Sequence, residues 1–257
     1  DEFFSMSNFA ICTSCGVNGV SRLHGEVSKK MFQNLWPGYS VEESHIGYVT
    51  NGVHYGTWTS KAWQQLHKAT FGEKFLSDMS NSSYWSKIYS VPDESLWEIK
   101  QSQRERLIVY AKEALRKSWT EKFEDPKKIV RINQTLNKNT LTIGFARRFA
   151  TYKRAYLLFS NLERLSKIVN NPDYPVQFIF AGKAHPQDKP GQDIIKEIVR
   201  ISKLPEFLGK VIFLENYDMN LAKQLVQGVD IWMNTPTRPL EASGTSGMKA
   251  VMNGTMN

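Results

Sequence analysis

Four short apolar runs in the second half of the sequence constrain the fold more than any other feature. They are rich in β-forming residues, and helix-like patterns lie between them at 152–169, 191–202 and 221–227. The runs occupy residues 141–146, 176–181, 210–215 and 230–234. Strands that alternate with helices form parallel βαβ units, and strands covered on both faces are apolar along their whole length. The sequence therefore predicts an α/β fold with a parallel sheet flanked by helices.

The first part of the chain predicts mainly helices. Apolar residues recur at helical spacing over 4–36, and the longest helical pattern covers 93–119. Between them, 47–52 is typical of a short strand or turn. We therefore expect a mainly helical segment over 1–135 and a parallel-sheet region over 136–257, which together form one structural unit.

Length and composition limit the class of protein. With 257 residues and 41% hydrophobic residues, the chain can bury a sizeable core. No run is long and apolar enough to span a membrane, and the start DEFFSMSNFA lacks the features of a signal peptide. We expect a cytoplasmic protein without a membrane partner. Because the sequence opens without methionine and stops at Gly-Thr-Met-Asn, we also expect it to be a piece of a longer chain.

The net charge of +8 raises the question of a polyanionic partner. Lysine and arginine are spread along the helical patterns among acidic residues, and no RNA-binding or helix-turn-helix signature is present. We therefore expect small anionic ligands rather than nucleic acid. Cys12 and Cys15 supply half of a zinc site at most, and no second pair of ligands follows them, so we expect no metal.

In parallel sheets, ligands bind beyond the carboxyl ends of the strands, so the loops after the strands carry the chemistry. Arg147, Arg148, Lys153 and Arg154 follow the first strand, where we expect a helix to begin. Cations at a helix N-terminus are unfavourable unless an anion lies among them. The pattern favours a phosphate site over its alternative, a solvated basic face.

The loop after the fourth strand combines an acid, hydroxyls, glycines and a lysine. Gly244 and Gly247 expose backbone N–H groups, and a helix beginning in this loop would direct its dipole at a ligand. Lys249 would lie in the first turns of that helix, where a lowered pKa suits Schiff-base chemistry. The alternative is an ordinary surface lysine. Tyr217, after the third strand, is either a rim residue or a core tyrosine.

These blocks resemble the pyridoxal-phosphate-dependent α-glucan (glycogen, starch and maltodextrin) phosphorylases. EASGTSGMK at 241–249 is similar to the family's cofactor-lysine motif, and GFARRFATYKRA at 144–155 to the phosphate-binding segment of its short bacterial and archaeal branch. The resemblance covers 4–257. Further matching blocks are VNGVSRLHGEV, YVTNGV and VIFLENYDMNLAKQLVQGVDIWMNTP.

The resemblance implies a fold and an activity. The fold would be the C-terminal, Rossmann-like half of a GT-B-type glycosyltransferase, with 136–257 binding pyridoxal phosphate and phosphate. The activity would be reversible phosphorolysis of the terminal glucosyl residue of an α-1,4-glucan to α-D-glucose 1-phosphate, with retention of configuration. The cofactor's phosphate would be the proton-transfer partner of the substrate phosphate.

The resemblance also implies residue roles. Lys249 would bind pyridoxal phosphate covalently, and Arg148 and Lys153 would hold the substrate phosphate as catalytic residues. Arg147 stands where the animal enzymes usually carry lysine, and since both are cations we expect the role to be kept. The other cofactor contacts would be Thr245, Ser246, Arg147 and Tyr217. The sugar contacts would be Glu241, Ser243, Gly244, Asn18 and Tyr152.

The sequence is also compared with the patterns of two other functions. A glycogen synthase-like glucosyltransferase would carry a second glutamate about seven residues after Glu241, but the eighth residue is Lys249. A non-catalytic, glucan-binding remnant of the fold stays open. The N-terminal domain of the same polypeptide would be the main partner, and we expect this segment to be inactive without it. A homo-oligomer is compatible with the sequence, which leaves glucan preference and allosteric control open.

Overall fold

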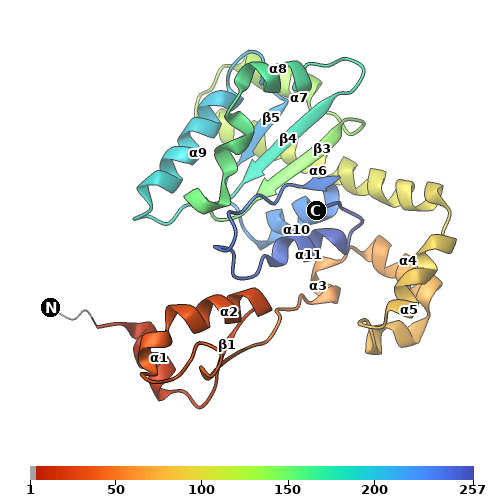
Figure 1. Cartoon of the computed structure of the whole chain (residues 1–257). Helices are drawn as coiled ribbons and strands as arrows, with labels where there is room; N and C mark the ends of the chain where they lie inside the picture. Colours follow the sequence, from red (N-terminus) through yellow and green to blue (C-terminus); the bar gives the residue numbers. More distant parts are fainter. Residues whose placement is uncertain (1–3) are drawn as a thin grey trace. The chain divides into compact units, whose positions relative to one another are not determined.

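The computed structural model describes residues 4–257 and divides the chain into two compact units (Figure 1). Unit 1 comprises residues 1–53 and 236–245, and unit 2 comprises 54–235 and 246–257. The chain therefore leaves unit 2 after Thr235 and re-enters it at Ser246, inside the glycine-rich loop. The expected boundary between 135 and 136 stays a prediction.

Unit 1 contains two helices and a small parallel sheet. Helix α1 (Met6–Thr13) is capped by Ser5, and α2 (Arg22–Met31) is capped by Ser21, whose hydroxyl accepts from the amide of His24. The strands β1 (Val17–Gly19) and β2 (Ile46–Tyr48) pair in parallel, and the short 3-10 helix η1 (Gln33–Leu35) lies between α2 and β2 in the chain. At Gly19, an added Cβ would lie 2.4 Å from the nitrogen of Gly25, so the turn into α2 needs a glycine.

The larger sheet lies in unit 2 and is entirely parallel. Its strands are β3 (Leu141–Ala146), β4 (Val176–Ala181), β5 (Val211–Leu214) and β6 (Ile231–Trp232). They are ordered β5-β4-β3-β6, with Leu141 opposite Val176. The predicted α/β fold with a parallel sheet is confirmed.

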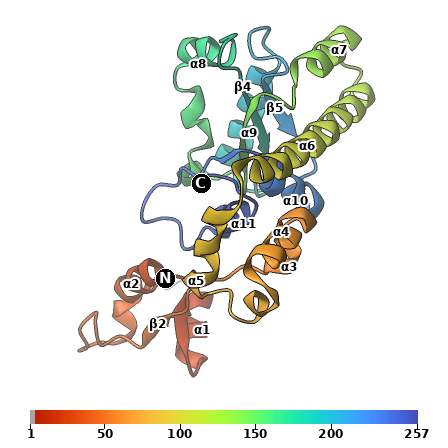
Figure 2. The ribbon, with the colours of Figure 1, turned by 90° about the vertical axis from the view of Figure 1, so that its right-hand side faces the viewer.

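Helices cover both faces of this sheet (Figures 1 and 2). Successive residues of β4 point to opposite sides, so Phe178 and Phe180 join one hydrophobic cluster and Ile179 and Ala181 join the other. The first cluster also contains residues of α8 (Leu162–Val169) and α9 (Lys189–Ser202). The second contains residues of α6 (Asp93–Glu121), α7 (Pro126–Thr135), α10 (Met219–Gly228) and α11 (Thr245–Val251).

A third cluster packs the helices that precede α6. Aromatic residues of α3 (Tyr55–Trp58), α4 (Lys61–Phe71) and the 3-10 helix η2 (Glu73–Ser77) form its core. The helix α5 (Ser82–Trp85) and the 3-10 helix η3 (Ser86–Ser90) supply partly buried residues around it. His67 is buried in this cluster and stacks on Phe71 with ring centroids 5.1 Å apart.

The predicted helix over 152–169 is wrong in its first half. Residues after β3 form two 3-10 helices, η4 (Thr151–Lys153) and η5 (Ala155–Phe159), and α8 begins only at Leu162. Arg154 separates them in a left-handed conformation with φ of 53°, which a continuous α-helix does not allow. The cluster of Arg147, Arg148 and Lys153 therefore does not lie at an α-helix N-terminus, and its attraction for anions must come from the side chains.

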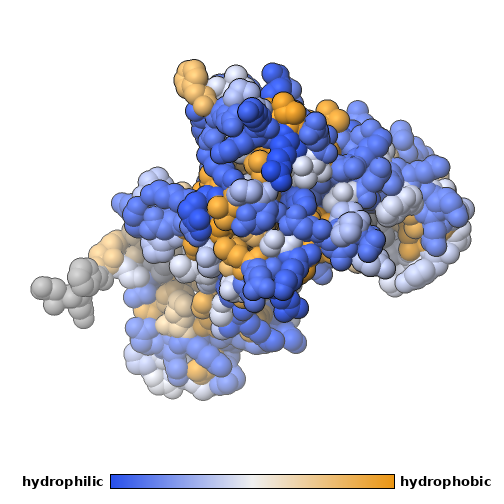
Figure 3. All heavy atoms as spheres, turned by 90° about the horizontal axis from the view of Figure 1, so that it is seen from above, coloured by the Kyte–Doolittle hydropathy of each residue, from blue (hydrophilic) through white to orange (hydrophobic). Residues whose placement is uncertain are grey.

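Hydrophilic residues predominate on the face seen from above in Figure 3, and hydrophobic residues form separate patches on it. Among residues 4–257, no helix has the length and apolar character needed to cross a membrane.

Candidate functional site

The strand order contains a switch point between β3 and β6. From β3 the chain runs outward through β4 to β5 and then crosses to β6 on the other side of β3. Loops that leave neighbouring strands in opposite directions open a crevice at their carboxyl ends, where ligands of such sheets bind. Arg147 directly follows β3 and Asn234 lies just beyond β6, so the topology places both residues at this switch point.

Arg147 is buried and held in place. Its exposed fraction is 8%, and its Nη1 donates a hydrogen bond of 2.6 Å to Oδ1 of Asn234. On the main chain, its amide donates to the carbonyl of Ala181 at the end of β4. The side chain and the main chain of Arg147 are therefore each anchored to a neighbouring strand end, and a guanidinium held in this way suits recognition of a phosphate.

A glycine after β4 permits this arrangement. Gly182 has φ of 146°, and a Cβ added there would lie 2.0 Å from the carbonyl oxygen of Arg147. Next to it, the amide of Phe149 donates to the carbonyl of Lys183. The loops after β3 and β4 are therefore joined along their backbones, and only glycine fits at the point of closest approach.

Lys153 is the second buried cation of this loop, with an exposed fraction of 7%. Its Nζ lies 4.8 Å from the centroid of the Tyr152 ring. Its carbonyl accepts from the hydroxyl of Thr235, while Nε of Arg154 donates to the carbonyl of Thr235 at 2.7 Å. The left-handed turn at Arg154 thus ties Lys153 to the segment after β6.

Arg148 and Tyr217 differ in exposure. The side chain of Arg148 is exposed, next to the buried Arg147. Tyr217 is partly buried against the cluster that contains Ala250 of α11. Burial raises the pKa of its phenol, and the charge of Arg147 acts in the opposite direction. Tyr217 is therefore neutral at physiological pH, and it lies close enough to Arg147 for that charge to influence its pKa.

Lys249 lies on α11, as predicted, and contacts an indole. Its Nζ is 3.9 Å from the centroid of the Trp58 ring, a cation–π geometry. Partial burial lowers the pKa of its amine, which makes the neutral, nucleophilic form more accessible than in an exposed lysine. Ser246, three residues earlier, accepts a hydrogen bond from Nε1 of Trp232 in β6. The helix that carries Lys249 is therefore fixed to the sheet.

The predicted sugar-binding residues lie mainly in unit 1. Asn18 is exposed on β1, and Glu241, Ser243 and Gly244 are partly buried in the 236–245 segment. The hydroxyl of Ser21 donates to the carbonyl of Ala242 at 2.6 Å, which links this segment to the start of α2. Thr245 is the last residue of unit 1 and the first of α11.

The division of the chain thus separates two groups of predicted residues. Arg147, Arg148, Lys153, Tyr217, Ser246 and Lys249 belong to unit 2, together with Tyr152. Two further residues of unit 2, Asn234 and Trp58, were not predicted from the sequence. Asn234 follows a strand, so the rule that directed attention to the other loops could have found it. Trp58 carries no such signal, because it meets Lys249 only through the fold.

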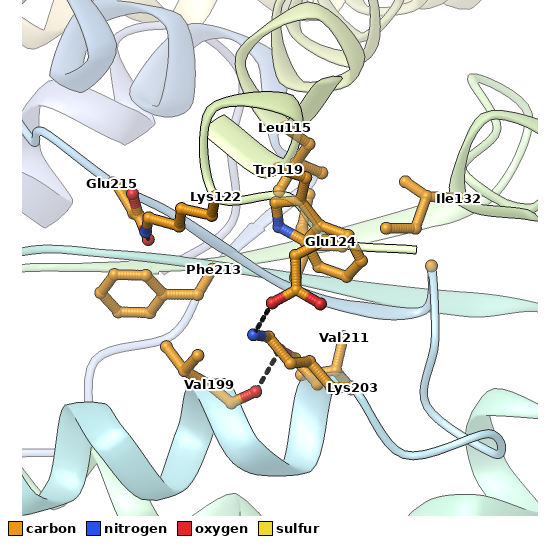
Figure 4. Close-up of a pocket in the computed structure, with 13 residues that line it drawn as sticks. Leu115, Trp119, Lys122, Glu124, Ile132, Val199, Lys203, Val211, Phe213 and Glu215 are labelled. Atoms are coloured by element: carbon orange, nitrogen blue, oxygen red, sulfur yellow. Dashed lines mark hydrogen bonds and ion pairs between the residues drawn. The ribbon is translucent and has the colours of Figure 1, made fainter. Parts of the chain in front are cut away.

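Two hollows in unit 2 do not have Arg147, Lys153 or Lys249 in their walls. A pocket of 50 Å³ lies between α6, β5 and α9, where Glu124 and Lys203 form an ion pair (Figure 4). Glu215 in its wall pairs with Lys122 and accepts from Ser118, so it has a structural role. The pocket is too small for a sugar or a cofactor.

The second hollow, of 860 Å³, has Leu141 and Val176 in its wall, at the amino ends of β3 and β4. It therefore lies at the end of the sheet opposite to Arg147. Among residues 4–257, no group of three or more histidine, cysteine, aspartate or glutamate side chains is arranged to hold a metal ion.

Comparison with known proteins gives a family for the chain. The family model described as carbohydrate phosphorylase matches residues 1–257. The chain is 46% identical to a glycogen phosphorylase of Aquifex aeolicus, a match that covers 100% of this chain and 37% of the relative. It is 43% identical to a maltodextrin phosphorylase of Thermococcus litoralis, over 99% of this chain and 30% of the relative. The rabbit muscle form of glycogen phosphorylase is 27% identical over 98% of this chain and 29% of the relative. The chain belongs to the carbohydrate phosphorylase family.

Proposed function

We propose that this chain is the cofactor-binding part of an α-1,4-glucan phosphorylase, which releases terminal glucosyl residues of a storage glucan as α-D-glucose 1-phosphate. The observation that carries the proposal is the pair of buried cations, Arg147 and Lys153, at the carboxyl ends of the strands in the same unit as a lysine with a lowered pKa. Relatives of this chain are named glycogen and maltodextrin phosphorylases. Since the chain spans only 37% and 30% of the lengths of two of them, the activity belongs to the longer protein.

The residues of unit 2 fit pyridoxal phosphate. An aldehyde requires an amine that loses its proton readily, and burial lowers the pKa of Lys249. A phosphate requires fixed cations and donors, which Arg147 provides while Asn234 orients it. We assign Thr245, Ser246 and Tyr217 to the binding of pyridoxal phosphate as well. Thr245 and Ser246 lie on α11 with Lys249, and the charge of Arg147 acts on the pKa of Tyr217.

The chemistry requires two phosphates side by side. When bound, the cofactor supplies a second phosphate that exchanges a proton with the substrate phosphate. Two such anions repel strongly at short distance unless cations lie around them. Arg147 and Lys153 are buried, so water screens their charges little, and Arg148 adds a more exposed charge at the same loop. These cations hold the substrate phosphate where it can protonate the glycosidic oxygen.

We assign the glucosyl unit to the remaining predicted residues. Glu241 accepts hydrogen bonds from hydroxyl groups of the glucosyl unit, and Ser243 and the backbone of Gly244 complete its recognition. Asn18 and Tyr152 supply further polar contacts. As the substrate phosphate donates its proton, an oxocarbenium-like centre forms at the sugar, and the phosphate captures it on the same face.

The test is made on the full-length protein loaded with pyridoxal phosphate. We expect it to form glucose 1-phosphate from glycogen or maltodextrin only when inorganic phosphate is present. A Lys249→Ala variant should lose this activity and the cofactor's absorption, whereas Lys167→Ala, an exposed lysine of α8, should keep both. Transfer of glucose from a nucleotide sugar would contradict the proposal, and so would glucan binding without any phosphate-dependent turnover.

A further inference from the structure

Asn253 is the second residue after α11 and is fully buried, with an exposed fraction of 0%. Its side-chain nitrogen donates to the carbonyl of Lys249 at 2.8 Å and to the carbonyl of Trp58 at 3.0 Å. Its Oδ1 accepts from the amide of Ser60 at 2.8 Å. One amide group therefore contacts the main chain of both members of the Lys249–Trp58 pair.

These three contacts join three helix ends. Lys249 is in the last turn of α11, Trp58 is the last residue of α3, and Ser60 is the N-cap of α4. Helix ends leave backbone carbonyls and amides without partners inside the helix, and a buried end needs partners from elsewhere. A primary amide has two donors and one acceptor group, and here each of them serves one of these ends.

A second set of contacts fixes Asn253 itself. The carbonyl of Asn253 accepts from Nζ of Lys100, a buried lysine of α6, which also donates to Oγ1 of Thr255 at 2.7 Å. The next residue, Gly254, has φ of 67°, and a Cβ there would lie 2.6 Å from the Trp63 ring. The turn that carries Asn253 is therefore held by its own bonds and by tight packing.

We propose that Asn253 is a positioning residue for Lys249. By holding the backbones of Lys249 and Trp58 on one amide, it keeps the amine on the face of the indole, partly shielded from water, at the distance of 3.9 Å. Loss of the amide frees the two chain segments to move apart and leaves their carbonyls without a donor. The functional meaning of this position depends on the proposed role of Lys249 as the cofactor lysine.

The test uses the full-length protein and two variants, Asn253→Leu and Asn253→Ser. Leucine removes all three hydrogen bonds at similar volume, and serine keeps one hydroxyl donor. Each protein is labelled with 5-fluorotryptophan, and a Trp58→Phe variant assigns the fluorine resonance of Trp58. Separately, pyridoxal phosphate is trapped with borohydride, and the label on Lys249 is measured by mass spectrometry relative to the exposed Lys167.

We expect the Trp58 resonance to shift and broaden in Asn253→Leu, while the resonance of Trp119, far along the chain in α6, stays in place. The ratio of label on Lys249 to label on Lys167 should fall by about fivefold in Asn253→Leu and by less in Asn253→Ser. Asn161→Leu, which removes the cap of α8, is the matched control for lost stability and should change neither measurement.

An unchanged Trp58 resonance and an unchanged labelling ratio in a folded variant would overturn the proposal. If Asn253→Leu does not fold, Asn253→Ser decides by the same two measurements. Absence of label on Lys249 in the unmodified protein would instead contradict the proposed function, and the Trp58 resonance would still test the role of Asn253.

Discussion

At the residue scale, four buried cations distinguish unit 2: Lys100, Arg104, Arg147 and Lys153. A buried charge is costly unless other groups compensate it. Arg104 lies 3.3 Å from Asp230, whose other carboxylate oxygen accepts from the amide of Thr142, so this pair supports the start of β3. Nζ of Lys100 donates hydrogen bonds to two backbone carbonyls and to the hydroxyl of Thr255. Arg147 and Lys153 lie at the carboxyl ends of the strands, where parallel sheets bind ligands, and this location is why we assign them to the phosphates.

Arg147→Met tests that assignment. It removes the charge and the guanidinium donors and keeps an apolar side chain of similar length, so binding of pyridoxal phosphate to the full-length protein should weaken by about tenfold to a hundredfold. Arg147→Lys should recover most of this loss. Titration by absorption measures the effect, and Arg164→Met, an exposed arginine of α8, is the matched control. Unchanged cofactor affinity in Arg147→Met would remove Arg147 from the site.

At the element scale, the strands were predictable and the loops were only partly so. Phe178 to Ala181 are apolar without interruption because helices cover both faces, and that pattern is visible in the sequence. The break at Arg154 was not visible, because Ala155, Leu158 and Phe159 keep a helix-like spacing in 3-10 geometry. Arg154 adopts its left-handed turn through tertiary contacts with Thr235.

Helix α4 carries a pH-sensitive residue. His67 stacks on Phe71 and contacts the hydroxyl of Tyr55 at 2.8 Å. Burial lowers the pKa of His67 from 6.5 to about 4. Between these two pH values, the imidazole is protonated in the unfolded chain and largely neutral in the folded chain. Stability is therefore lost as the pH falls from 6.5 to 4, by about 2 kcal/mol.

Urea unfolding of the chain at pH 7 and at pH 4.5 measures this loss. His67→Gln removes the titrating imidazole, so the difference between the free energies of unfolding at pH 7 and pH 4.5 should become smaller. The variant should be less stable than the unmodified chain at both pH values. His54→Gln, an exposed histidine, should leave the difference unchanged. An equal pH dependence in His67→Gln and in the unmodified chain would show that another group is responsible.

The contact between α6 and α10 depends on a glycine. A Cβ at Gly228 would lie 2.5 Å from Cβ of Leu107, which is itself fully buried. Gly228→Ala should therefore destabilise the chain by about 1–3 kcal/mol through overpacking. Gly16→Ala, with no atom within 4 Å of the added Cβ, is the control and should change stability little. Denaturant midpoints compare the two, and equal midpoints would contradict the close packing of these helices.

At the scale of the whole molecule, the order of the strands determines where a parallel sheet is expected to bind ligands. Because β6 and β4 lie on opposite sides of β3, the switch point of the sheet lies beside Arg147. This position could be assigned only once the strand order was known. The sequence alone located the rim and its cations. It could not reveal that Trp58 and Asn253 meet Lys249, because the first of these contacts joins residues far apart in the chain. It also gave no sign that the 236–245 segment belongs to a separate compact unit.

The central claim is that Lys249 is the residue that binds the cofactor. The most direct measurement reduces the full-length protein with borohydride in the presence of pyridoxal phosphate and locates the label by peptide mass. We predict one stoichiometric label on the peptide that contains Lys249, and reaction at lower pH than for exposed lysines because burial lowers its pKa. A label confined to other lysines, or no stoichiometric label at all, would contradict the account.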